Sequence, residues 1–194
     1  MKGMAVIGAL LVLGAAPTWG ASIGLFPDPQ GSSCSMQVPT PPGLDTLYVS
    51  LSTVGLPEGI EWGLGVSFRI EGMPPGWFVR LLSGPPADHV VGDPLGADGV
   101  LLYFYGLHAG SRIQLYTFLI GPSPGGSSTV LQVSQSHFSA CWGEVPACPY
   151  VSYERFEIFC ECVEGGTLFV NTPGNCTVGV EPTTWSRVKV LYAR

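Results

Sequence analysis

The chain has few charged residues, and this shortage excludes a class of partner. Only 11% of its 194 residues are charged, with 8 Lys and Arg against 14 Asp and Glu. Proteins that bind nucleic acid need basic side chains to displace counterions from the phosphates. A formal charge of −6 with so few basic residues therefore excludes nucleic acid as the expected partner.

The chain also lacks an apolar run long enough to span a membrane. Its most apolar stretch, residues 4–16, is shorter than the roughly 20 apolar residues that a spanning helix needs. Lys2 precedes this stretch, and small residues follow it at Gly20 and Ala21. A charged start, a short apolar segment and small residues are typical of a cleavable export signal. We predict a signal peptide over residues 1–20, and cleavage after Gly20 or after Ala21 both fit.

Removal of this segment leaves about 173 residues, a length that suits one domain. Lys2 is the only charged residue of the signal, so the mature chain carries −7 instead of −6. We expect a secreted protein, extracellular or at the cell surface, with no membrane-spanning segment after cleavage.

All six cysteines lie in the mature part, at Cys34, Cys141, Cys148, Cys160, Cys162 and Cys176. An even number behind an export signal indicates disulfides. Cys141 and Cys148 bracket a short loop, so we predict that they pair. The other four allow three connectivities, which the sequence leaves open.

A metal site is the alternative for the cysteines near the end. Cys160, Cys162 and Cys176 could supply thiolates, but structural zinc sites usually carry matched pairs of Cys or His two to four residues apart. The oxidising compartment favours disulfides instead.

Stretches with helical periodicity are almost absent, whereas Gly (27) and Pro (18) are abundant. They cluster between short segments rich in Val, Ile, Leu, Tyr and Phe, a pattern typical of sandwiches and barrels. We predict an all-β antiparallel sandwich of about 8–10 strands over residues 21–180. The predicted strands are 47–52, 66–71, 77–82, 100–105, 112–120, 129–135, 154–162 and 167–171.

Three of these segments alternate with the period of two that a strand with one buried face requires. The inward residues of the first two segments are expected to be Leu47, Val49, Leu51, Val66, Phe68 and Ile70. In 154–162 the inward set is Phe156, Ile158, Cys160 and Cys162, which places both cysteines on the core side.

The last residues, 181–194, have a different pattern. Trp185, Val188, Leu191 and Tyr192 fall on one stripe of a short helix. The segment either packs on its own domain, as a last helix or strand, or serves as a basic docking or sorting tag.

A catalytic constellation is missing. Residues 121–125 read G-x-S-x-G, the string of a hydrolase nucleophile elbow, but Pro124 obstructs the helix that must follow. We interpret this segment as a hairpin connection. The histidines His89, His108 and His137 are scattered, without the spacing of metal ligands.

Two groups of carboxylates deserve comparison with known sites. Asp88, Asp93 and Asp98 could donate oxygens to calcium, although their spacing matches no compact calcium loop, and turn formation explains them. We expect no cofactor, with calcium as the alternative. The glutamates Glu154, Glu157, Glu161 and Glu164 could act as a glycosidase pair, but a charged outer strand face is the simpler interpretation.

Aromatic residues exceed what one sheet face needs. On an exposed surface they would offer stacking platforms for sugars or an apolar patch for a protein. The residues concerned are Trp62, Trp77, Phe78, Tyr103, Phe104, Tyr105, Tyr116 and Trp142. Most are expected to fill the core, and Trp142 to be partly exposed.

Three stretches resemble a loose group of uncharacterised bacterial secreted proteins. They are residues 23–34 (IGLFPDPQGSSC), 68–77 (FRIEGMPPGW) and 183–194 (TTWSRVKVLYAR). The middle stretch also looks like the core strand and turn of cohesin- or immunoglobulin-like sandwiches. The resemblance implies that fold and export, and no activity.

These features together predict a non-catalytic β-sandwich that binds a protein or glycan, or serves as a structural component. The alternative is a secreted hydrolase with a carboxylate or serine site that the sequence does not reveal.

Overall fold

The computed structural model describes residues 21–39, 43–56, 64–105, 112–122, 128–138, 141, 147–154 and 158–174. These residues form thirteen β-strands and no helix, so none of them forms a helix long and apolar enough to cross a membrane. The strands are β1 (Ser22–Phe26), β2 (Ser35–Met36), β3 (Asp45–Ser52), β4 (Leu64–Glu71), β5 (Phe78–Ser83), β6 (His89–Asp93), β7 (Gly99–Phe104), β8 (Arg112–Gly121), β9 (Thr129–Ser134), β10 (Tyr150–Glu154), β11 (Ile158–Cys162), β12 (Glu164–Gly165) and β13 (Thr167–Val170).

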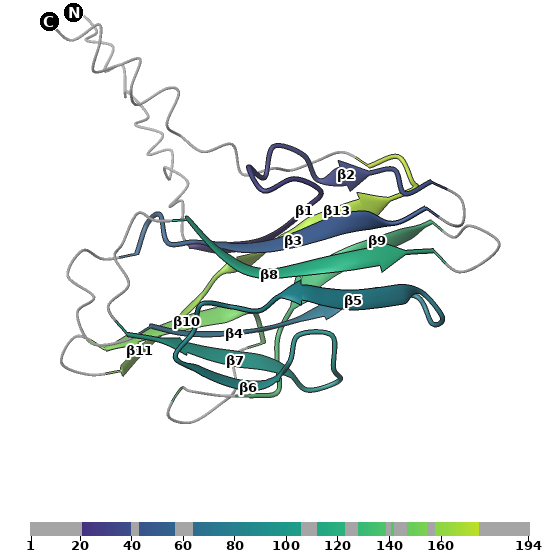
Figure 1. Ribbon diagram of the computed structural model, residues 1–194. Coiled ribbons are helices and arrows are strands. Elements are labelled where there is room, and N and C mark those ends of the chain that lie inside the picture. The colour runs from purple at the N-terminus through teal and green to yellow at the C-terminus, as the bar shows by residue number, and fades with distance from the viewer. Residues whose placement is uncertain are drawn as a thin grey trace, which may run out of the picture.

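The strands build two sheets that pack face to face (Figure 1). One has five strands in the order β12-β1-β3-β8-β5, and the other has eight, in the order β11-β10-β4-β9-β13-β2 with β7 and β6 joined to it through β4. All pairs are antiparallel except β1 with β12 and β2 with β13. The predicted all-β sandwich is confirmed, with more strands than the 8–10 expected.

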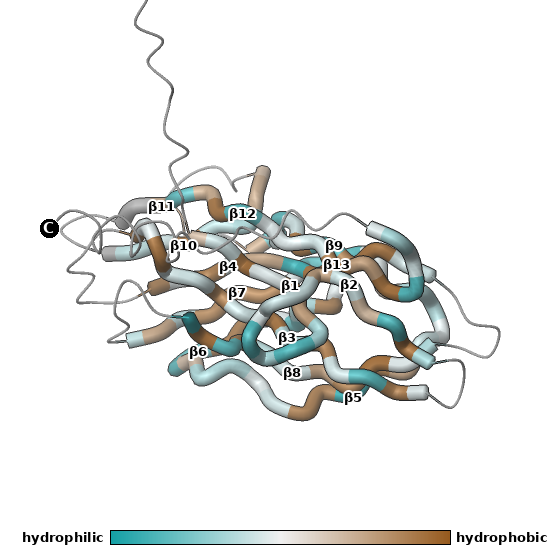
Figure 2. Tube along the Cα trace, turned by 90° about the horizontal axis from the view of Figure 1, so that it is seen from above, coloured by the Kyte–Doolittle hydropathy of each residue, from teal (hydrophilic) through white to brown (hydrophobic). Residues whose placement is uncertain are grey.

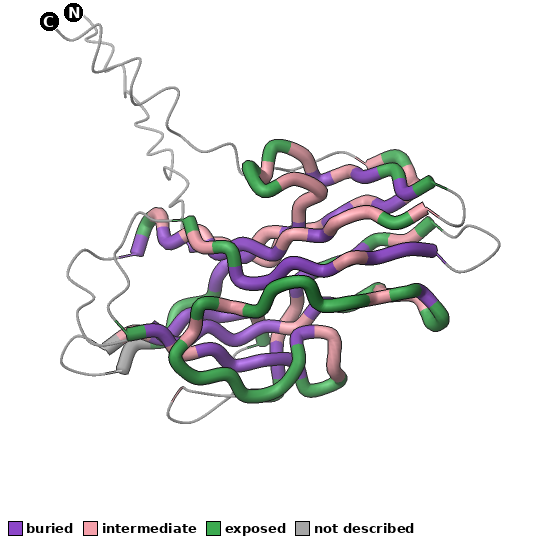
Figure 3. Tube along the Cα trace, viewed as in Figure 1, coloured by how far each residue is buried: buried purple, intermediate pink, exposed green. Residues whose placement is uncertain are grey.

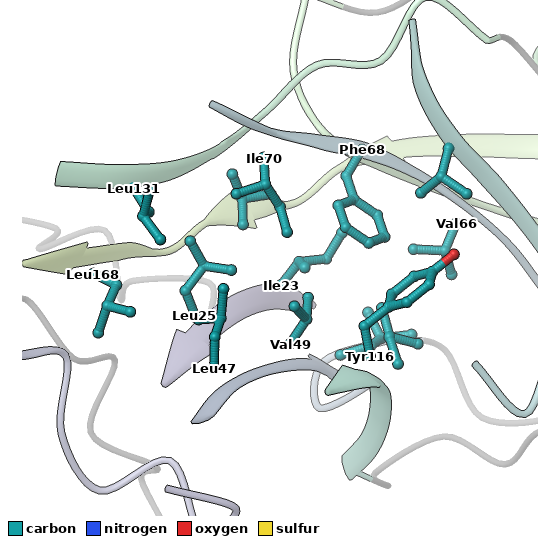
Figure 4. Packing of buried hydrophobic residues seen from close by; sticks show 14 of the residues in the cluster. Ile23, Leu25, Leu47, Val49, Val66, Phe68, Ile70, Tyr116, Leu131 and Leu168 are labelled. Atoms are coloured by element: carbon teal, nitrogen blue, oxygen red, sulfur yellow. The ribbon is translucent and has the colours of Figure 1, made fainter. Parts of the chain in front are cut away.

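The core lies between the sheets and follows the predicted alternation. Leu47, Val49 and Leu51 point inward from β3, and they are fully buried. Val66, Phe68 and Ile70 point toward them from β4 (Figure 4). Apolar side chains on alternate positions of facing sheets thus fill the interior, as a sandwich requires.

The predicted strand 154–162 is wrong. The structure has two antiparallel strands there, β10 and β11, which pair Tyr150 with Cys162 and Ser152 with Cys160. The chain reverses between residues 154 and 158, so the regular alternation in the sequence does not correspond to one continuous strand. The side chains of residues 154–159 lie outside the described set.

The predicted Cys141–Cys148 pair is also wrong. Cys141 is bonded to Cys160, and Cys148 to Cys162, with Cα–Cα distances of 6.0 and 5.7 Å. Because Cys160 and Cys162 occupy alternate positions of one strand, each of them meets a different cysteine of the segment before β10. These bonds confirm the disulfide prediction, remove Cys160 and Cys162 as metal ligands, and leave Cys176 outside the described residues. Cys34 is disulfide-bonded as well.

Cys160 and Cys162 do not face the core as expected. Both residues are exposed, and so is Glu161 between them. β11 is the last strand of its sheet in the described part of the chain, and residues 160–162 are exposed on both of its faces. The two disulfides tie this edge strand to the segment 141–148.

Candidate functional site

The strand β5 forms one edge of the five-stranded sheet. In the described part of the chain it pairs with β8 alone, which leaves its other edge without a partner strand. An unpaired edge offers a row of backbone N–H and C=O groups to another strand. Figure 2 shows β5 at the rim of the molecule, beyond β8.

Turn residues fix both ends of β5. Before it, residues 74–77 form a turn closed by the N–H of Trp77, which donates to the carbonyl of Pro74 at 3.3 Å. Gly76 takes a φ of 81° in this turn, a conformation that favours glycine. The buried indole of Trp77 anchors the strand to the core. After it, Pro85 and Pro86 cannot donate to a ladder, so strand pairing stops there.

The side chains of β5 are exposed on both faces of the strand. Phe78, Leu81 and Leu82 are 48%, 53% and 51% exposed. Their strand is coloured as exposed along most of its length in Figure 3, while the adjacent β8 is largely buried. Apolar colour also runs along β5 at the rim of the molecule in Figure 2. Edge strands usually carry charges that discourage such contacts, and β5 has a single one.

The register with β8 assigns these side chains to the two faces. Val79 lies opposite Ile120 and packs against the core, so Leu81, two residues later and opposite Phe118, also points to the inner face. Its exposure shows that the second sheet does not extend over this position. The register shifts between Leu81 and Ser83, and Leu82 has no residue opposite it.

Arg80 points to the outer face of the five-stranded sheet. It lies opposite Leu119 of β8, and the diagonal neighbours on that strand are Thr117 and Gly121. None of these side chains carries a negative charge. In the part of the chain that the structure describes, Arg80 has no ion-pair partner.

Among the described residues, the strand β6 lies at one of the free edges of the other sheet, and it is less suited to pairing than β5. Val90 and Val91 are exposed on it. His89 packs its ring edge-on against Tyr105, with 6.0 Å between the ring centroids. The strand ends at Gly92 and Asp93, where Gly92 adopts a φ of 89° and a tight turn follows. A strained end and a terminal charge discourage strand addition.

A polar hollow of about 400 Å³ lies over β4 and β9, lined among others by Arg69, Glu71 and Ser134. The guanidinium of Arg69 is already engaged. It forms an ion pair with Glu71, and it donates to the hydroxyl of Ser134 at 3.1 Å and to the carbonyl of Ala97 at 3.0 Å. The hollow therefore offers no free charge to a ligand.

The structure does not bring the aspartates together. The carboxylate of Asp88 accepts from the N–H of Tyr105 at 2.7 Å, and that of Asp93 from the N–H of Leu95 at 2.9 Å. Asp98 lies 3.2 Å from the Nδ1 of His137. Each carboxylate thus serves a separate local contact, and the described residues contain no group of three metal-ligating side chains.

The other candidate residues are also separated. His89 and His137 are exposed on different segments, and His108 lies outside the described residues. Glu161 and Glu164 are exposed, Glu157 lies outside the described set, and nothing is described of the Glu154 side chain. Gly121 is the last residue of β8, and the next strand, β9, belongs to the other sheet, so the segment 121–125 does not begin the hairpin that we expected.

Several aromatic residues fill the core as expected. Trp77, Phe104 and Tyr116 are buried. Tyr105 and Phe78 are exposed. Tyr103 is partly buried, and this burial raises the pKa of its hydroxyl. The nearby hydroxyls of Tyr150 and Tyr105 raise that pKa further. Trp62, Trp142 and the tail residues Trp185, Val188, Leu191 and Tyr192 lie outside the described residues.

The comparisons with known proteins give no family. No family model matches the chain, and no curated protein matches it. Solved structures do match it. One is a chain of a type I cohesin–dockerin complex from Clostridium thermocellum, with 10% identity and a TM-score of 0.45 over 78% of this chain and 99% of that one. Another is a type I cohesin from Pseudobacteroides cellulosolvens, with 8% identity and a TM-score of 0.42 over 80% of this chain and 95% of that one.

We predicted a strand over residues 77–82, which β5 confirms, but not the exposure of Leu81 and Leu82. The signal was present, because Leu81 and Leu82 are consecutive large apolar residues. A strand that buries one face alternates apolar and polar residues, and two adjacent leucines break that pattern.

Proposed function

We propose that this protein is an exported, non-catalytic module that binds another protein through the edge of β5. The observation that carries the proposal is a strand that has no partner on one edge in the described part of the chain and that exposes three large apolar side chains, Phe78, Leu81 and Leu82. Exposed apolar patches on soluble proteins commonly mark interaction sites. The disulfides support export, because they persist in oxidising compartments.

A protein partner fits this edge better than a glycan. Leu81 and Leu82 are aliphatic, and they offer no flat π face on which a sugar ring could stack. Phe78 is the aromatic residue of the strand. Backbone groups and aliphatic side chains are what a polypeptide segment can match.

The test compares a double variant on β5 with a single variant on another strand. In Leu81→Lys/Leu82→Lys, two exposed leucines of β5 become charged, whereas Val130→Lys changes an exposed apolar residue of β9. The wild-type protein and both variants are used as baits against the exported proteins of the source organism. We expect the same partner on the wild type and on Val130→Lys, and at least about tenfold less of it on the double variant.

The comparison requires that all three proteins melt at the same temperature. Equal recovery of every partner on all three baits would contradict the proposal, and so would a failure to recover any partner.

A further inference from the structure

We propose that β5 binds its partner by strand addition, and that the added strand carries a carboxylate next to Arg80. This inference rests on the proposed function and specifies the partner as an extended polypeptide segment. Three features of β5 in the described part of the chain carry it: a backbone edge without a partner strand, the apolar side chains on both of its faces, and the charge of Arg80, which has no ion-pair partner there.

The free edge has a defined length. It begins after the turn at residues 74–77 and ends before Pro85, so the six residues of β5 are open to pairing. Six residues of strand span about 20 Å. A segment of about the same length would extend the five-stranded sheet by one strand and satisfy the exposed N–H and C=O groups of β5.

The side chains of β5 define what the added strand presents. Phe78 and Arg80 point to the outer face, and Leu81 to the inner face, where the opposite sheet does not cover it. Cross-strand neighbours lie on the same face of a sheet. An apolar residue on the inner side of the added strand would therefore cover Leu81, and one on its outer side would contact Phe78.

Arg80 adds the requirement that the added strand carry a negative charge. Its neighbours on β8 are Leu119, Thr117 and Gly121, which leave the guanidinium without a counter-charge on that side. The opposite position on an added strand is the remaining cross-strand neighbour. A carboxylate there would form the cross-strand pair that β8 does not supply.

The same residue argues against a second copy of this chain as the occupant. When two β5 strands pair antiparallel with residues 78–82 fully overlapped, Arg80 lies opposite the Arg80 of the second copy. Like charges directly opposite each other destabilise a pair of strands. Both copies also carry a net negative charge, since the full chain is at −6.

The experiment selects peptides from a random library on the full-length protein and removes those that also bind Leu81→Lys/Leu82→Lys. We expect enriched sequences with apolar residues at alternate positions and an Asp or Glu among the residues between them. The strongest peptide is then synthesised with each backbone N–H methylated in turn, and its Kd is measured by calorimetry.

If the peptide binds by strand addition, the effect of methylation on the Kd alternates from one peptide residue to the next. Methylation at every second residue removes an N–H that faces β5 and weakens binding at least about fivefold, while methylation between them changes it less than about twofold. Arg80→Glu weakens binding of the acidic peptide by up to about fivefold, and a Lys in place of the peptide carboxylate restores it.

Three results would overturn the inference. The first is that no peptide is enriched, the second that methylation has the same effect at every position, and the third that the protein forms dimers in sedimentation that Leu82→Lys dissociates. The proposed function is judged separately by the whole-protein capture, which fails only if β5 binds no partner. Capture that depends on Leu81 and Leu82, together with methylation that has no alternating effect, would keep the function and reject strand addition.

Discussion

Tyr116 stacks on Phe118 in the core, with the ring centroids 5.6 Å apart and the planes at 11°. The ring of Tyr116 also meets Phe68 edge-on at 6.3 Å. Its hydroxyl is buried, and it has no hydrogen-bond partner among the residues that the structure describes. A buried polar group without a partner costs free energy that an apolar group of the same shape does not.

Replacing this hydroxyl should stabilise the protein. We expect Tyr116→Phe to raise the free energy of unfolding by about 1 kcal/mol, because it removes an unsatisfied group and keeps the stacked ring. Tyr150→Phe is the matched control, since the buried Tyr150 donates to the carbonyl of Phe138 at 3.0 Å. That variant should lose about 1 kcal/mol. Urea denaturation measures both, and a loss in Tyr116→Phe would show that its hydroxyl is satisfied.

Tyr116 also predicts how stability changes at high pH. Burial raises the pKa of its hydroxyl above the ordinary 10.0, and the nearby charge of Asp93 raises it further. The pKa of Tyr116 is higher in the folded state than in the unfolded state. Its contribution to the free energy of unfolding is therefore complete below pH 10, and it is lost as the unfolded chain ionises above that pH. The urea midpoint should therefore fall between about pH 10 and about pH 12, and it should fall less in Tyr116→Phe. Equal slopes in the two proteins would refute this.

The disulfides predict a pattern among paired variants. The two disulfides close loops of 19 and 14 residues. One of them is absent from Cys141→Ser/Cys160→Ser, and the other is absent from Cys148→Ser/Cys162→Ser. Each should lower the free energy of unfolding by about 3 kcal/mol. Cys141→Ser/Cys148→Ser breaks both bonds and should cost more than either. Mass spectrometry of peptides from the unreduced protein identifies the pairs directly, and a peptide that links Cys141 to Cys148 would contradict the structure.

If residues 1–20 are a cleaved export signal, as we predict, the structure favours one end for the mature chain. The sequence allows cleavage after Gly20 or after Ala21. Ala21 is buried, and its carbonyl accepts from the N–H of Glu164 at 3.3 Å. Cleavage after Ala21 would remove these contacts, so we expect the secreted protein to begin at Ala21. Its intact mass measures this, and a chain that begins at Ser22 or still contains residues 1–20 would show the prediction to be wrong.

The sequence predicted the core strands because burial on one face leaves a local signal. Leu47, Val49 and Leu51 alternate with polar or amphipathic residues, and so do Val66, Phe68 and Ile70. Each of these six side chains is buried as expected. The period of two depends on neighbouring residues alone, so no knowledge of the partner strand is needed.

The predictions that were wrong concern features that depend on pairing between segments far apart in the sequence. Whether Cys141 meets Cys148 or Cys160 is decided by the antiparallel pairing of β10 with β11, which no local pattern shows. No strand is predicted over β6, and turn formation explains Asp88 and Asp93, which flank its short apolar segment. Which strand stays unpaired at the edge, as β5 does, follows only from the order of strands in the sheet.

The two parallel pairs have a consequence for biosynthesis. β1 pairs with β12 and β2 with β13, so the first two strands are completed by the last two. Contacts between distant parts of a chain form late in folding. Neither layer can close before the final strands have left the ribosome. A chain whose first strands are completed by its last ones therefore stays incompletely folded until its synthesis is nearly finished.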